Sequence, residues 1–93
     1  MKVTRWPDRT VPVTLRRGDV VLLCADRAGT LDRYATVGRV WVHRASREVA
    51  RIETADASGP VTYRVRDAAR LLYACEGGRR HRGAVGLIVE RAS

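Results

Sequence analysis

The sequence contains no phenylalanine, and aromatic residues of all kinds make up only 5% of the chain. The core must therefore be built from Val, Leu, Ile and Ala, with two Trp and three Tyr as the only large side chains. A chain of 93 residues with such a core forms one small domain. We expect this domain to be marginally stable alone, or to be supported by a partner or by a second copy in a homodimer.

Other features are missing as well. No apolar run approaches the length of a membrane span, and residues 1–10 are charged where a signal peptide would be apolar. We therefore expect a cytoplasmic protein without a membrane partner, with Cys24 and Cys75 reduced and buried. The two cysteines and two histidines form no CxxC or HxxxH pair, and no nucleophile–base motif surrounds His43 or His81. These absences predict no metal site, no cofactor and no catalytic residues.

Lysine is nearly absent too, since Lys2 is the only one, yet the formal net charge is +8 and the pI is about 11.0. Arginine carries the rest of the positive charge, and guanidinium groups bind phosphate and carboxylate in bidentate geometry. This charge favours a nucleic acid (DNA or RNA) or an acidic protein surface as the partner. The basic residues are spread evenly along the chain, so folding must assemble any binding surface.

Hydrophobic periodicity predicts mostly strands. Residues 1–10 read as a flexible leader and residues 11–93 as one domain, in which Pro12 limits residues 11–15 to an edge strand. Residues 16–19 form a turn before a central strand at 20–24. Further strands are expected at 34–44, 47–54, 61–66 and 84–89, with a phase slip between Val49 and Ile52 that suggests a bulge.

The period changes after this last alternating strand. Asp67 is a suitable N-cap, and the apolar residues Ala68, Leu71, Leu72 and Cys75 follow at helical spacing until a pair of glycines. A short helix over residues 67–75 is therefore predicted, with this apolar stripe packed in the core. The fold class is mostly β: five to six short antiparallel strands closed into a small barrel, with one short helix before the last strand.

This order of elements resembles an SH3-like small barrel, and Arg17-Gly18-Asp19-Val20-Val21 resembles the start of KOW and Tudor-type domains. Two narrower resemblances imply different functions. Residues 16–22 are similar to the opening strand of MazF/PemK-type mRNA interferases, which are RNA-cleaving toxins. A Gly18-Asp19 turn followed by a Thr36-Val37-Gly38 strand is similar in outline to CarD-type transcription regulators, whose Tudor-like module binds RNA polymerase. Because this fold hosts many functions, the fold alone does not tell which of them the protein has.

The polar face of the predicted sheet is the first candidate binding surface. If Val40, Val42 and the apolar residues of strand 61–66 point inward, a set of basic and aromatic side chains points outward together. This set comprises Arg39, Trp41, His43, Arg51, Arg64 and Arg66. Arginine would contact phosphates and an exposed indole would stack on a base. Alternatively, Trp41 is an aromatic lid on the core and the arginines solvate a strand face.

A second candidate surface is the loop over residues 77–83, where arginines and a histidine lie between glycines. Its basic residues are Arg79, Arg80, His81 and Arg82. Such a loop is either a phosphate clamp or a solvated connection. The leading hypothesis is a non-enzymatic nucleic-acid-binding module with Arg39, Trp41, Arg64 and Arg66 as its main contacts. The alternative is a protein-interaction module that uses the same face, and an interferase-like endoribonuclease is third.

Overall fold

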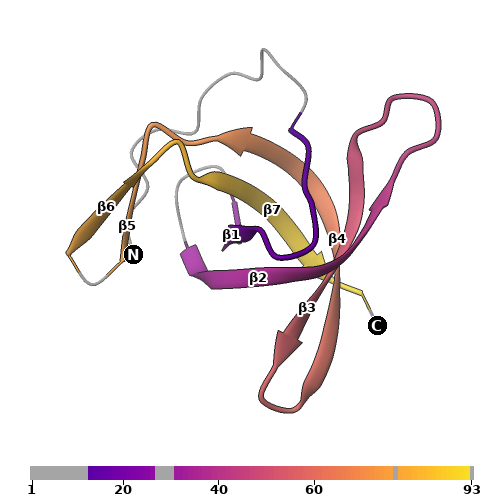
Figure 1. Cartoon of the computed structure of the whole chain (residues 1–93), viewed down its shortest axis with the longest axis horizontal. Coiled ribbons are helices and arrows are strands. Elements are labelled where there is room, and N and C mark those ends of the chain that lie inside the picture. The colour runs from indigo at the N-terminus through magenta and orange to yellow at the C-terminus, as the bar shows by residue number, and fades with distance from the viewer. Residues whose placement is uncertain (1–12, 27–30, 77, 93) are drawn as a thin grey trace.

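Seven strands make up the regular structure in the computed structural model of the protein, which describes residues 13–26, 31–76 and 78–92. Five of them close into a barrel in the order β1-β2-β3-β4-β7, and the other two form a separate hairpin, β5-β6 (Figure 1). The barrel strands are β1 (Val20–Cys24), β2 (Leu31–Val42), β3 (Val49–Asp56), β4 (Gly59–Arg70) and β7 (Val85–Arg91); the hairpin strands are β5 (Tyr73–Glu76) and β6 (Arg79–Arg82).

The mostly β prediction is thus confirmed, and the closed five-stranded barrel is consistent with an SH3-like fold at the level of strand number and closure. Two details of the prediction are wrong. The strands are not all short, because β2 and β4 each run for 12 residues. They are not all antiparallel either, because β1 and β7 close the barrel as a parallel pair.

Strand β1 is buried on both faces, which explains its continuous apolar sequence. Val21 and Leu23 point into the barrel, where they pack with Val37, Ile52 and Leu87. On the other side of the strand, a second core forms around Leu22 and Cys24, which pack with Leu71 and Ala74. A strand with two apolar faces needs cover on both of them, and the chain after β4 supplies the outer cover.

This outer cover takes the place of the predicted helix over residues 67–75, which was wrong. Ala68 and Arg70 pair with Leu87 and Val85 in the β4-β7 ladder. The Leu71 N–H then donates to the Ala84 carbonyl oxygen at 2.8 Å. Because these backbone groups are bonded across the sheet, they are not available for helical bonds. Of the apolar residues that were spaced for a helix, Ala68 packs in the barrel core and Leu71 in the outer core, whereas Leu72 is exposed and Cys75 belongs to neither core.

The turn before β1 and the bulge in β3 were predicted correctly. The Asp19 N–H donates to the Arg16 carbonyl oxygen at 3.1 Å, and Gly18 has a φ of 93°, which glycine adopts without steric cost. In the β2-β3 ladder, the partner of Trp41 is Arg51 and that of Val42 is Val49, so Ala50 is the extra residue of a bulge. Beyond the bulge, Val42 is 55% exposed instead of pointing inward as expected.

Three further predictions concern the N-terminal region and membranes. The leader at residues 1–10 lies outside the described residues, as do residues 11 and 12 of the predicted edge strand. The described part of that segment, around Val13 and Leu15, is not a strand, although Val13 is buried in the barrel core. In the portion of the chain that the structure describes, no helix has the length and apolar character to cross a bilayer.

Candidate nucleic-acid interface

A row of side chains crosses four neighbouring barrel strands. Trp41 on β2 is the register partner of Arg51 on β3, Arg51 is the partner of Arg64 on β4, and Arg64 is the partner of Glu90 on β7. Directly opposed residues on adjacent strands lie on the same face of a sheet. The fold therefore brings together an indole, two guanidinium groups and a carboxylate from positions spread over half of the chain.

The indole end of this row borders an open groove of about 330 Å³. We call it the Trp41 groove; its lining residues are Trp41, His43, Ala50, Arg51, Arg64 and Val65. Trp41 is 40% exposed, so this large aromatic residue is accessible to solvent. None of these lining residues is acidic. The groove thus presents an aromatic surface beside two positive charges, and Ala50, the extra residue of the bulge, is its smallest side chain.

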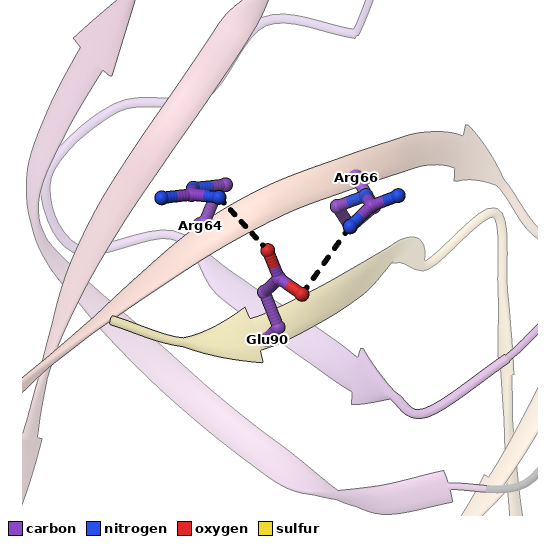
Figure 2. Close-up of polar contacts among 3 residues, drawn as sticks. All are labelled: Arg64, Arg66 and Glu90. Carbon is purple, nitrogen blue, oxygen red and sulfur yellow. Dashed lines mark hydrogen bonds and ion pairs between the residues drawn. The ribbon is translucent and has the colours of Figure 1, made fainter. Parts of the chain in front are cut away.

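The carboxylate end of the row is held by two arginines (Figure 2). The Nη1 of Arg64 lies 3.1 Å from Oε1 of Glu90, and the Nη1 of Arg66 lies 3.3 Å from Oε2 of the same carboxylate. The side chains of Arg64 and Arg66 are 59% and 61% exposed, and that of Glu90 is 44% exposed. Solvent screens ion pairs of this kind, so each contributes little to folding stability.

Arg39 is exposed on β2 but is not among the residues that line the Trp41 groove. Its register partner is Glu53 on β3, which places a carboxylate directly opposite it. Of the sheet-face residues singled out from the sequence, the structure therefore gathers four in one groove. These are Trp41, His43, Arg51 and Arg64. Arg66 joins them through Glu90, and Arg39 lies one row away.

The segment that was expected to be a basic loop is the hairpin β5-β6. Arg79, Arg80 and Arg82 all lie on β6, whose four side chains are exposed. The guanidinium carbon of Arg80 lies 5.4 Å from the centroid of the Tyr73 ring, a cation–π distance. The His81 ring meets the Tyr34 ring of the barrel edge-on, with centroids 5.2 Å apart. The arginines are thus presented by a strand that contacts the barrel through a ring pair.

The hairpin and the Trp41 groove are separate surfaces. In Figure 1 the hairpin lies at the left of the molecule, whereas the end of β2 and its turn into β3 lie at the upper right. The structure therefore does not bring Arg79, Arg80 and Arg82 together with the sheet-face residues. A ligand that touches both surfaces has to span the molecule, which measures 34 Å along its longest axis.

Sequence reasoning missed Ala50 and Val65 of the Trp41 groove, and also Glu90, Arg91 and Tyr73. Glu90 and Arg91 lie opposite Arg64 and Tyr63 only because β7 pairs with β4, and no local pattern reports that pairing. Tyr73 lay within the predicted helix. Among the described residues, no three His, Cys, Asp or Glu side chains are grouped as metal ligands would be.

Comparison with known proteins adds no family to this description. No protein-family model matches the chain, and no curated protein or solved structure is significantly similar to it.

Proposed function

We propose that this protein is a non-enzymatic nucleic-acid-binding module, an SH3-like barrel of the KOW and Tudor type, that holds single-stranded segments in the Trp41 groove. The observation that carries the proposal is the groove itself, where Trp41, a residue 40% exposed, adjoins Arg51 and Arg64. Stacking on an exposed ring requires an unpaired base, and a guanidinium beside it can contact the phosphate of the same strand. The net charge of +8 adds long-range attraction to any polyanion.

The experiment is a fluorescence-anisotropy titration of labelled single- and double-stranded DNA and RNA at several salt concentrations. Phosphate contacts give a linear fall of log affinity with log salt, with a slope of about −0.7 per contact for single strands. Arg51→Ala and Arg64→Ala should each make the slope shallower by about that amount. Arg70→Ala is the matched control, because Arg70 is exposed on the same strand β4 but does not line the groove. Slopes equal to that of Arg70→Ala would contradict the proposal.

A cleavage assay tests the third hypothesis, an interferase-like endoribonuclease. An interferase-like enzyme cleaves RNA, whereas a binding module leaves it intact. Electrophoresis of the RNA after incubation with the protein should show the full-length oligonucleotide. Cleavage that is lost in an Arg64→Ala variant would replace the binding proposal with an enzymatic one.

A protein-interaction module is the second candidate function, and one observation favours it. Val42 is 55% exposed immediately after Trp41, so the end of β2 presents two apolar side chains side by side in sequence. Exposed apolar and aromatic residues beside arginine are typical of protein interfaces. Weak nucleic-acid binding at physiological salt, together with a protein complex that Trp41→Ala or Val42→Ser disrupts, would favour this function. The surface also suits a second copy of the chain, which analytical ultracentrifugation would detect.

A further inference from the structure

A second hollow adjoins the Trp41 groove and differs from it chemically. It encloses about 250 Å³ and is lined by Arg51, Arg64, Glu90, Arg91 and Ala92. We call it the Arg91 hollow. Arg51 and Arg64 line both cavities. The indole lines only the Trp41 groove, whereas the Arg91 hollow is surrounded by three guanidinium groups and one carboxylate, so its local charge is positive.

Strand pairing assembles this hollow. The partners Arg51, Arg64 and Glu90 occupy one row across β3, β4 and β7. Arg91 is the last residue of β7, and the following N–H of Ala92 donates to the Thr62 carbonyl oxygen at 2.9 Å. This bond anchors the end of β7 to β4. The arginines are thus carried by three paired strands and not by a loose tail. The backbone is therefore already ordered, which lowers the conformational entropy lost when an anion binds.

The position of Glu90 indicates what the arginines are arranged to hold. Its two carboxylate oxygens are divided between two guanidinium groups, one bonded to Arg64 and the other to Arg66 (Figure 2). The two non-bridging oxygens of a phosphodiester make the same demand, since each accepts a charge-assisted bond from a separate donor. All three side chains are about half exposed, so Glu90 can swing into solvent at small cost.

We propose that the Arg91 hollow is a phosphate subsite, in which a phosphodiester of the bound strand displaces Glu90 from Arg64. The inference rests on the proposed function and deepens it. In a nucleotide, a sugar joins the base to its phosphate, so a stacking surface and a phosphate site must adjoin. The shared residues Arg51 and Arg64 give the two cavities that relationship. Arg91 becomes a phosphate-binding residue, and Glu90 becomes a competitor that weakens binding in the free protein.

The test compares Glu90→Gln with Glu53→Gln in the full chain, by anisotropy with a single-stranded RNA oligonucleotide. Both variants remove one negative charge from the barrel sheet, but Glu53 lies opposite Arg39 and outside the hollow. Releasing two exposed ion pairs should raise the affinity of Glu90→Gln at least about threefold above that of Glu53→Gln. Arg91→Ala should lower affinity and make the salt slope shallower by about 0.7. Equal affinities of the two glutamine variants would overturn the proposal.

A second probe distinguishes failure of the subsite from failure of the proposed function. Inorganic pyrophosphate contains no nucleobase that could stack on Trp41, so its binding should not depend on Trp41. In NMR titrations, pyrophosphate should shift the backbone amides of Arg64 and Arg91, with tighter binding to Glu90→Gln than to Glu53→Gln. If this holds while Trp41→Ala leaves RNA affinity unchanged, the phosphate site is supported and the base-stacking part of the proposed function is contradicted. If pyrophosphate shifts neither amide, the phosphate subsite is refuted.

Discussion

Trp41 and Arg51 are directly opposed on β2 and β3, and the register of the two strands shifts immediately after them. The bulge at this point adds Ala50, which lines the same groove. A bulge bends its strand and changes the direction of the side chains beyond it. Here the extra residue is Ala50, whose small side chain interrupts the inward and outward alternation of side chains along β3. Trp41 and Arg51 therefore line the same open groove, where we propose that a base stacks.

This relationship predicts that Trp41 contributes to binding more than to folding. Trp41→Ala should weaken binding of single-stranded RNA by about 1–3 kcal/mol and leave the salt slope unchanged, because stacking releases no counterions. Trp41→Phe keeps a ring and should retain most of the affinity. Anisotropy titrations and thermal unfolding of both variants check this. Unchanged affinity with a lowered melting temperature would show that Trp41 covers the core instead.

Two adjacent leucines test the revised structure of residues 67–75. Leu71 is 1% exposed in the outer core, whereas Leu72 is 55% exposed. Leu71→Ala should lower the free energy of unfolding by about 2–5 kcal/mol, since it leaves a cavity beside Leu22. Leu72→Ala should change it by less than about 0.5 kcal/mol. Urea denaturation measures both values. A large loss for Leu72→Ala would support the helical stripe that the sequence suggests.

The difference between these leucines illustrates which parts of the fold could be predicted from the sequence. Features set by neighbouring residues were predictable, including the glycine turn at Gly18, the apolar strand Val20–Cys24 and the bulge near Val49. Their causes are local: a positive φ, a β-branched run and a break in alternation. For residues 67–75 the local signal favoured a helix, but the ladder with β7 used the same backbone groups. Pairing distant in sequence outweighed local spacing.

The candidate site follows the same division. Alternation alone placed Arg64 and Trp41 on the outer face of the sheet, and the structure brings both to one groove. Alternation along one strand does not reveal which strand lies beside it, so Glu90 and Arg91 were missed. The positive charge of the surface was thus predictable. The ion pair between Glu90 and Arg64 was not, because it depends on the register between β4 and β7.

The two cysteines should react at different rates. Neither forms a disulfide bond, but Cys24 is buried in the outer core and Cys75 is only half-buried. The prediction that both are buried is therefore wrong for Cys75. In the native state, Ellman's reagent should label Cys24→Ser, which retains Cys75, much faster than Cys75→Ser, which retains Cys24. In denaturant the two variants should react alike. Rapid native labelling of Cys24 would indicate that the outer core opens frequently.

Thr54 offers a stabilising substitution in the barrel. The residue is 1% exposed, and its Oγ1 has no hydrogen-bond partner among the described residues. Its register partners are Val37 and Val61. Because a buried hydroxyl without a partner costs about 1–3 kcal/mol, Thr54→Val should raise the free energy of unfolding by about 1 kcal/mol. Thr54→Ser keeps the hydroxyl and loses the methyl group, so it should be destabilising. A less stable Val variant would mean that the hydroxyl is bonded in solution.

The hairpin arginines provide the last prediction, since the hairpin β5-β6 that carries them lies on the other side of the barrel from the turn between β2 and β3 (Figure 1). Replacing Arg79, Arg80 and Arg82 by Ala removes three exposed charges from β6. If these residues contact phosphates, the salt slope should become shallower by up to about 0.7 for each contact. Because the two surfaces share no residues, the loss should add to that of Trp41→Ala within about 0.5 kcal/mol. A double-mutant cycle on RNA affinity measures this. A coupling above about 1 kcal/mol would show instead that one ligand segment engages both surfaces together.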